Sequence, residues 1–291
     1  MQTINIDEKI DKIEKVGLVI RPNTHDLHKY YKQIKNKLDL YGVQLILDGE
    51  SAFLLGVEGV EFDKMCQMSD IIISLGGDGT LISVSRRSFK YNKPILGVNI
   101  GKLGFLVDID VKELENFIDK LFKNEYRIDR RMVLEVIFHK KEDSLSAFAF
   151  NDIVFSRPMV AGMVDLQAFV DDVHFNNYYG DGLIVSTPTG STAYNLSSGG
   201  PVVFPLTEAL ILTPLCSHSL TQRPLILPAD FKVKIKSSDK VLIAIDGQDI
   251  YHLEDYESIE FKMATKGVRL IHRVERNYFK VLKEKLKWGD A

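Results

Sequence analysis

The sequence is poor in cysteine, lacks a long apolar run and has no marked excess of charge of either sign. Its only two cysteines, Cys66 and Cys216, lie far apart without the spacing of a zinc site. A disulfide framework is therefore not expected, and a reducing compartment fits two isolated thiols. The net charge of −3 argues against a nucleic-acid-binding surface. No apolar run approaches the roughly 20 residues that span a bilayer. The polar N-terminal residues do not resemble a signal or transit peptide, so we expect a cytoplasmic protein.

What is present is an ordinary globular composition, with 45% hydrophobic and 26% charged residues in a chain of 291. A chain of this length favours two domains. In the first part, strand and helix patterns alternate. We predict strands over 15–20, 43–48, 70–77 and 94–101, and helices over 24–42, 79–87 and 111–124, the first with Thr24 as its N-cap. Strands that alternate with helices indicate a parallel sheet covered on both faces.

The pattern changes near residue 126, where short alternating β segments with polar turns begin and indicate an antiparallel domain. The fold class is thus α/β plus all-β. We expect a Rossmann-like parallel α/β domain over residues 1–125 and a β-rich, dinucleotide-binding domain over residues 126–275. A C-terminal helix within 276–291 is expected to complete the first domain.

The segment GGDGT, residues 76–80, follows a predicted buried strand and opens a predicted helix. Ligands gather beyond the carboxyl ends of parallel strands, and glycines with helix N-terminal N–H groups suit a phosphate. A carboxylate repels phosphate, so Asp78 has a purpose there if it contacts a hydroxyl or a metal ion. It could accept a hydroxyl proton during phosphoryl transfer. The alternative is an N-cap aspartate in a tight turn, and this segment alone leaves both interpretations open.

The second unusual stretch is YYGDGLIVSTPTGSTAYNLSSGGP, residues 178–201. It is rich in Ser, Thr and Gly, carries Asp181 beside a glycine, and is expected to start a helix near Ser191. Such loops can place N–H groups and hydroxyls around a polar ligand. A long surface loop with a serine N-cap is the alternative, and we favour a binding function.

Several segments together resemble the NAD kinase family over nearly the whole chain. The matching segments are GGDGT (76–80), NIGKLGFL (99–106), FNDIVFSR (150–157), DGLIVSTPTGSTAYNLSSGGP (181–201), TPLCSHSLTQRPLILP (213–228), IDGQ (245–248) and FKVLKEKLKW (279–288). GGDGT by itself also occurs in related form in lipid kinases and phosphofructokinases, whereas its combination with TPTGSTAY is specific.

The resemblance implies transfer of a phosphoryl group from ATP, or from polyphosphate in some members, to the 2′-hydroxyl of the adenosine ribose of NAD. Asp78 would face that hydroxyl as the catalytic group. Similarity places Gly79, Phe105, Asn151 and Asp152 around the adenosine half of NAD. It places Asp181, Thr189, Thr192, Ala193, Tyr194, Asn195, Leu196, Ser197 and Gln248 around the rest. A divalent ion, Mg²⁺, would bridge the nucleotide phosphates, and the assembly implied is a homodimer or homotetramer.

Two positions depart from the family pattern. Asp152 stands where glutamate is usual, and Tyr179 stands where the family often has Arg or Lys. Two other functions remain open at this point. A lipid kinase of the diacylglycerol or sphingosine type shares the glycine-aspartate loop, but gives no reason for TPTGSTAY and has no visible membrane-binding stretch. A non-catalytic dinucleotide sensor would not need Asp78. The seven histidines show no metal-ligand spacing.

Overall fold

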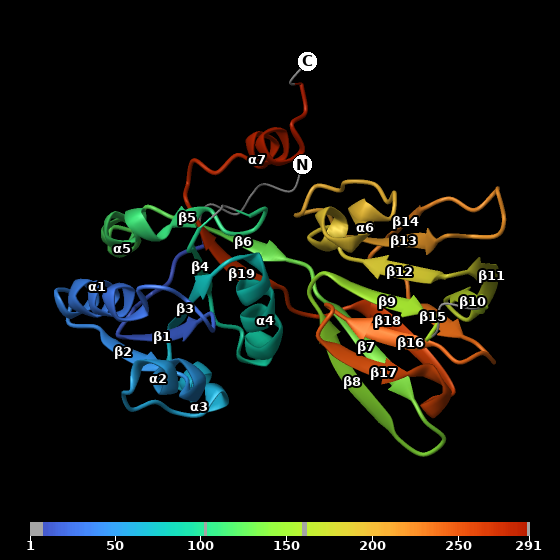
Figure 1. Ribbon diagram of the computed structural model, residues 1–291, viewed down its shortest axis with the longest axis horizontal. Helices are drawn as coiled ribbons and strands as arrows, with labels where there is room; N and C mark the ends of the chain where they lie inside the picture. The colour runs from blue at the N-terminus through green and yellow to red at the C-terminus, as the bar shows by residue number, and fades with distance from the viewer. Residues whose placement is uncertain (1–7, 102–103, 159–161, 290–291) are drawn as a thin grey trace. The chain divides into compact units, whose positions relative to one another are not determined.

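The computed structural model describes residues 8–101, 104–158 and 162–289, which divide into two compact units (Figure 1). Unit 1 comprises Met1–Arg130 together with Val268–Ala291, and unit 2 comprises Arg131–Gly267. No helix in the described part of the chain is long and apolar enough to cross a membrane.

Unit 1 is built on one sheet that contains seven strands within the described residues. The strands are β1 (Lys15–Ile20), β2 (Gln44–Leu47), β3 (Ile71–Gly76), β4 (Ile95–Asn99), β5 (Ile109–Asp110), β6 (Arg127–Arg131) and β19 (Val268–His272). Their order is β2-β1-β3-β4-β19-β6, with β5 paired to β4. The pairs formed by β1 with β2 and β3, and by β4 with β3, β5 and β19, are parallel, as the sequence predicts.

Helices cover both faces of this sheet. The helices of unit 1 are α1 (Leu27–Asp39), α2 (Gly49–Leu55), α3 (Phe62–Met68), α4 (Asp78–Ser88), α5 (Leu114–Phe122) and α7 (Tyr278–Leu286), with 3₁₀ turns η1 (Phe89–Tyr91) and η2 (Val111–Glu113). Helices α1 and α5 lie side by side (Figure 1) and share a core with alternate residues of β1 such as Val16 and Leu18. Gly17 points the opposite way, toward Met65 of α3, because successive strand residues face opposite sides.

The helices differ from the sequence prediction in two respects. The N-cap of α1 is Asp26 in the left-handed conformation, and the Thr24 hydroxyl instead donates to the carbonyl of Arg21. The prediction that Thr24 caps this helix was therefore wrong, because its hydroxyl closes a local turn. Helices α2 and α3 were not predicted, since seven residues show too little apolar periodicity to stand out.

The domain boundaries also differ from the predicted ones. The predicted β-rich domain, 126–275, includes β6 and β19, but both strands belong to the sheet of unit 1. The chain leaves this sheet at β6, forms all of unit 2, and returns as β19 between β4 and β6. The sequence pattern cannot reveal this return, because it predicts that a segment forms a strand but not the sheet in which that strand pairs.

Unit 2 contains two six-stranded sheets among the described residues, in which the paired strands are antiparallel. The first has the order β11-β10-β15-β18-β7-β8 and the second the order β14-β13-β12-β9-β16-β17. The elements of unit 2 are β7 (Leu134–His139), β8 (Ser144–Ala149), β9 (Asp152–Ser156), β10 (Val164–Val170), β11 (Val173–Gly180), β12 (Gly182–Ser186), η3 (Gly190–Thr192), α6 (Tyr194–Ser197), β13 (Ala209–Leu215), β14 (Leu225–Pro228), β15 (Val233–Lys236), β16 (Leu242–Ile245), β17 (Asp249–His252), η4 (Leu253–Asp255) and β18 (Ser258–Met263).

One apolar core holds the two sheets of unit 2 together. It takes alternate residues from both, such as Val136 and Phe138 of β7 and Ile153 and Phe155 of β9. Strands with one face on a shared core and one face outward are typical of a sandwich. The Ser- and Thr-rich loop that follows β12 lies at one end of this second sheet, where it forms η3 and the short helix α6.

Candidate active site

Asp78 lies where the sequence predicts it, directly after β3 and at the start of α4. The β3 strand is buried along its length, so the sheet fixes where its carboxyl end is. The N-cap of α4 is Gly77, which places Asp78 inside the first turn of the helix. Asp78 is therefore not the N-cap of α4.

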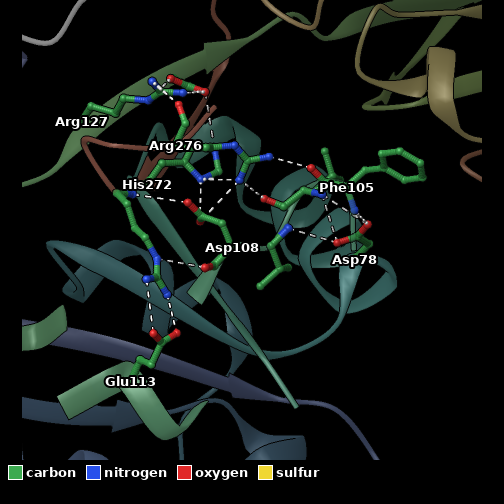
Figure 2. A network of polar contacts seen from close by, with 11 residues as sticks. Asp78, Phe105, Asp108, Glu113, Arg127, His272 and Arg276 are labelled. Atoms are coloured by element: carbon green, nitrogen blue, oxygen red, sulfur yellow. Dashed lines mark hydrogen bonds and ion pairs between the residues drawn. The ribbon is translucent and has the colours of Figure 1, made fainter. Parts of the chain in front are cut away.

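The Asp78 carboxylate instead binds the backbone of a second loop, residues 104–107, which we call the Phe105 loop. Its Oδ2 accepts the N–H of Phe105 at 2.7 Å, its Oδ1 accepts the N–H of Val107 at 3.1 Å, and the N–H of Leu106 reaches both oxygens at 3.2 and 3.3 Å. Gly104 has to be a glycine here, because a Cβ would lie 2.1 Å from the carboxylate. Figure 2 shows this contact, with the ring of Phe105 pointing away from it.

Gly79, the next predicted site residue, is exposed in the first turn of α4. A Cβ added there would meet no described atom within 4 Å. The fold of unit 1 therefore does not itself require a glycine at this position, whereas it does at Gly76, where a Cβ would lie 2.3 Å from the hydroxyl of Thr80. Open space beside Asp78 is what an approaching ligand needs.

In unit 2, the structure brings Asn151 and Thr189 into adjoining loops. The N–H of Thr187 donates to the carbonyl of Asn151 at 2.8 Å, and the Thr187 hydroxyl donates to the carbonyl of Phe150 at 2.7 Å. Gly190 packs so closely that a Cβ would lie 2.2 Å from the Asn151 carbonyl. Asn151 Oδ1 and Thr189 Oγ1 are both buried, and neither has a hydrogen-bond partner among the described residues. Buried polar atoms of this kind usually have a partner, so the two atoms indicate a missing polar ligand.

Asp152 is buried at the start of β9, beside Asp246. The Asp246 carboxylate accepts the N–H groups of Phe150, Asn151 and Asp152 at 2.7 to 3.1 Å, which resembles the way Asp78 holds the Phe105 loop. Burial raises the pKa of Asp152, and the neighbouring Asp246 carboxylate raises it further, to about 7. Asp152 thus lies in an environment that disfavours an uncompensated negative charge.

A pocket of about 690 Å³ in unit 2 contains three more predicted site residues, Asp181, Tyr194 and Ser197. Asp181 accepts a hydrogen bond from Arg157 at 3.1 Å, which fixes its carboxylate at the pocket wall. Tyr194 is 49% exposed, so its ring contributes little to the core and is available for stacking. Tyr179, which departs from the family pattern, is also exposed, and its ring lies edge-on to that of His218.

The remaining predicted residues have different surroundings. Asn195 is fully buried: its amide nitrogen donates to the carbonyls of Ser191 and Pro201, and its oxygen accepts from the Thr213 hydroxyl. Its side chain holds the loop after β12 together. Thr192, Ala193 and Leu196, close to it in the chain, are half-buried, and Gln248 is exposed in the turn between β16 and β17.

Sequence reasoning did not single out two groups that organise the site. Asp246 stands out in the sequence only as part of the matching segment IDGQ, although it follows an apolar strand and precedes a glycine, as Asp78 does. The buried side chains of His272 and Arg276 form a polar network with the half-buried Asp108 beside the Phe105 loop (Figure 2). Their separation along the chain hides this network from local patterns.

Comparison with known proteins gives a consistent result for both parts of the chain. Residues 16–126 match the ATP-NAD kinase N-terminal domain, and residues 150–273 match the ATP-NAD kinase C-terminal domain. The NAD kinase of Sulfurimonas denitrificans is 48% identical over 286 residues, which is 98% of this chain and 100% of that protein. The NAD kinase of Wolinella succinogenes is 44% identical over 98% of this chain and 99% of its own length.

Solved structures show the same fold. The crystal structure of yeast NADH kinase complexed with NADH matches with a TM-score of 0.88 at 26% identity, covering 96% of this chain and 89% of the yeast chain. An NAD kinase from Archaeoglobus fulgidus in complex with ATP matches with a TM-score of 0.75 at 24% identity, covering 94% of this chain and 98% of that chain, and supports the fold alone. Neither a lipid kinase nor a non-catalytic sensor gains support. Both halves of the chain match ATP-NAD kinase domains, and the relatives that match over its full length are NAD kinases. The chain therefore belongs to the ATP-NAD kinase family.

Proposed function

We propose that Asp78 is the group that accepts the proton of the attacking hydroxyl in the family's reaction. That reaction, the phosphorylation of the 2′-hydroxyl of the adenosine ribose of NAD to give NADP, is the activity of this chain. In the proposed step the hydroxyl oxygen bonds to the γ-phosphorus of ATP, the bond from that phosphorus to the bridging oxygen breaks, and the hydroxyl proton passes to Asp78. One observation carries the proposal: the carboxylate is held at the carboxyl edge of a parallel sheet, beside open space at Gly79.

Unit 2 supplies the polar groups that we propose for NAD. The unpartnered Asn151 Oδ1 and Thr189 Oγ1 would accept and donate hydrogen bonds to it. Asp152 would bind with its proton retained or its charge compensated, since its pKa is raised to about 7. The exposed ring of Tyr194 would stack on a flat ring of the dinucleotide, beside Asp181.

The other proposed NAD residues contribute through shape or backbone. Two of them, Gly79 and Phe105, belong to unit 1 and would flank the ribose. The others belong to unit 2 and are Thr192, Ala193, Asn195, Leu196, Ser197 and Gln248. Because the polar side-chain atoms of Asn195 already bind protein partners, we assign it the support of this loop rather than a side-chain contact with NAD.

We propose that Mg²⁺ enters with the nucleotide phosphates. No group of three or more His, Cys, Asp or Glu side chains in the described part of the chain is arranged to hold a metal ion. Mg²⁺ keeps several waters and is commonly held by substrate phosphates with few protein ligands, so this arrangement fits the residues present. The ion would neutralise charge on the transferring phosphoryl group.

We further expect ATP as the donor, with polyphosphate as the alternative, a cytoplasmic location, and assembly as a homodimer or homotetramer, without nucleic-acid or membrane partners. These expectations follow from the family and from the absence of a basic excess in the sequence. NADP formation with each donor, and sedimentation of the purified protein, would test the first and the third.

The test of Asp78 is the Asp78→Asn variant with NAD, ATP and Mg²⁺ as substrates. Asparagine has nearly the same size, but it cannot take up the proton, so we expect kcat to fall by about 10²–10⁴-fold while NAD still binds. Asp70→Asn is the matched control. Asp70 precedes the opposite end of β3 and accepts the N–H groups of Glu14 and Lys15. Its loss should reduce thermal stability but leave kcat per folded molecule unchanged. A turnover near wild type for Asp78→Asn would remove Asp78 from the chemistry.

A further inference from the structure

The Phe105 loop is held from two opposite sides. Asp78 accepts three of its backbone N–H groups, and Arg276 donates to its carbonyls. The Arg276 guanidinium reaches the carbonyl of Phe105 through Nη2 at 2.6 Å and that of Leu106 through Nη1 at 2.8 Å. The same peptide groups are thus fixed on one side by the carboxylate and on the other by a planar fork (Figure 2).

Arg276 is itself held in place by two side chains, those of Asp108 and Arg127. Its Nη1 lies 3.4 Å from Asp108 Oδ1, and its own carbonyl accepts a hydrogen bond from Arg127 at 3.1 Å. Asp108 also binds Nδ1 of His272 at 2.9 Å. Burial works to raise the pKa of Asp108, but His272 and Arg276 outweigh burial and lower it to about 2. Asp108 therefore stays charged and keeps the Arg276 fork in one orientation.

His272 completes this arrangement as a neutral group. It is buried at the end of β19, and burial together with the adjacent Arg276 cation lowers its pKa. His272 Nδ1 lies 2.9 Å from Asp108 Oδ1 and 3.0 Å from Arg276 Nη1, so the imidazole contacts both members of the ion pair. Asp108 and His272 thus both contact the Arg276 guanidinium, whose Nη1 and Nη2 reach the carbonyls of the Phe105 loop.

Stability alone is a weak reason for such a cluster. Buried ion pairs can often be replaced by apolar residues at little cost, because desolvating the charges offsets their attraction. Fixed geometry is a better-supported benefit. A displacement of about 1 Å in a reacting group can reduce a rate by about 10²-fold. The Asp78 carboxylate takes its orientation from the N–H groups that Arg276 holds in place.

We propose that Arg276 is a positioning residue for phosphoryl transfer, acting through the Phe105 loop on the Asp78 carboxylate. The proposal rests on the role assigned to Asp78 above. Arg276 touches neither substrate nor reacting atoms in this scheme. Its contribution is to hold two peptide groups so that the carboxylate faces the ribose hydroxyl.

The test compares Arg276→Lys with wild type. Lysine keeps the positive charge beside Asp108 but lacks the planar fork that reaches two carbonyls. We expect kcat to fall by about 10–100-fold, KM for NAD to change by less than about threefold, and the melting temperature to stay within a few degrees. Hydrogen exchange at the amides of Leu106 and Val107 should become at least about tenfold faster.

Arg273→Lys is the matched control. Arg273 donates to the Asp108 carbonyl and pairs with Glu113, but makes no contact with the carbonyls of Phe105 or Leu106. We expect its kcat within about twofold of wild type and unchanged amide exchange in the Phe105 loop. Activity is expressed per folded molecule, so that partial unfolding of Arg276→Lys does not imitate a loss of turnover.

Three outcomes would overturn the proposal: wild-type kcat per folded molecule in Arg276→Lys, a loss of kcat without faster exchange in the Phe105 loop, or an equal loss in the Arg273→Lys control. The double variant Asp78→Asn/Arg276→Lys separates this proposal from the proposed function. If Arg276 acts through Asp78, the double variant is no slower than Asp78→Asn alone. If Asp78→Asn by itself retains turnover, the role of Asp78 fails, and the exchange measurement still reports whether Arg276 holds the loop.

Discussion

Single carboxylates in this chain differ sharply in what surrounds them. Asp78 and Asp246 each accept several backbone N–H groups of a neighbouring loop. Asp152 is buried beside the Asp246 carboxylate, and no backbone N–H group among the described residues donates to its own carboxylate. The same residue type therefore anchors a loop in two places and, in a third, is a buried carboxyl group whose pKa is raised.

This difference predicts how stability depends on pH. The folded-state pKa of Asp152, about 7, lies above the ordinary value of an unfolded aspartate. Its favourable contribution is therefore complete below about pH 4 and is lost as the pH rises through about 7. An asparagine side chain does not titrate, so the stability of Asp152→Asn relative to wild type should rise by about 2–3 kcal/mol between about pH 5 and pH 8. Urea unfolding at several pH values would measure it.

Asp172→Asn serves as the control for this experiment. Asp172 is exposed, and its hydrogen bond to Lys234 lowers the pKa of the Asp172 carboxyl. Its substitution should therefore show no such rise in relative stability with pH. A pH-independent difference between Asp152→Asn and wild type would mean that Asp152 ionises normally in the folded protein.

At the scale of elements, close backbone contact between two loops organises the site in unit 2. A Cβ at Gly190 would lie 2.2 Å from the carbonyl of Asn151 and 2.7 Å from the hydroxyl of Ser186. Gly190→Ala should therefore separate these loops and displace Asn151 and Thr189. We expect a loss of about 1–3 kcal/mol in stability and a KM for NAD raised by about tenfold or more. Thermal unfolding and steady-state kinetics would measure the two effects.

Gly267→Ala is a suitable comparison, since its Cβ would lie 2.7 Å from the carbonyl of Arg131. It should lower stability to a similar degree without changing KM. Equal KM values in Gly190→Ala and wild type would show that the two loops need not touch for NAD to bind.

The sequence predicts the strands and helices better than it predicts which strands pair and which distant side chains come into contact. Strands 15–20, 70–77 and 94–101 appear as β1, β3 and β4, because continuous apolar runs are typical of buried parallel strands. The position of Asp78, directly after a buried strand and at the start of a helix, was predicted for the same reason. The network of Asp108, His272 and Arg276 was not predicted, since it depends on contacts between residues more than 160 positions apart. The assignment of β19 to the first sheet was missed on the same grounds.

At the scale of the whole molecule, unit 1 depends on a segment that follows unit 2 in the chain. Strand β19 lies between β4 and β6, and Ile271 belongs to the core of unit 1. Deletion of residues 268–291 should therefore prevent unit 1 from folding. We expect amides of β3 to lose their protection from hydrogen exchange, while amides of β12 in unit 2 keep it.

Removal of residues 287–291 alone leaves β19 and α7 intact, and β3 should then remain protected. Full protection of β3 in the longer deletion would mean that the sheet of unit 1 can close without its inserted strand.

The return of the chain through β19 also sets an order of events at the ribosome. When β6 emerges, the sheet of unit 1 still lacks the strand that lies next to β4. Translation at about 5–20 residues per second leaves that gap open for roughly 10 s while unit 2 is made. All of unit 2 is available to fold before β19 appears. The nascent chain therefore carries an incomplete first sheet, open beside β4, while unit 2 is made, and an unpaired sheet edge is the kind of surface that chaperones bind.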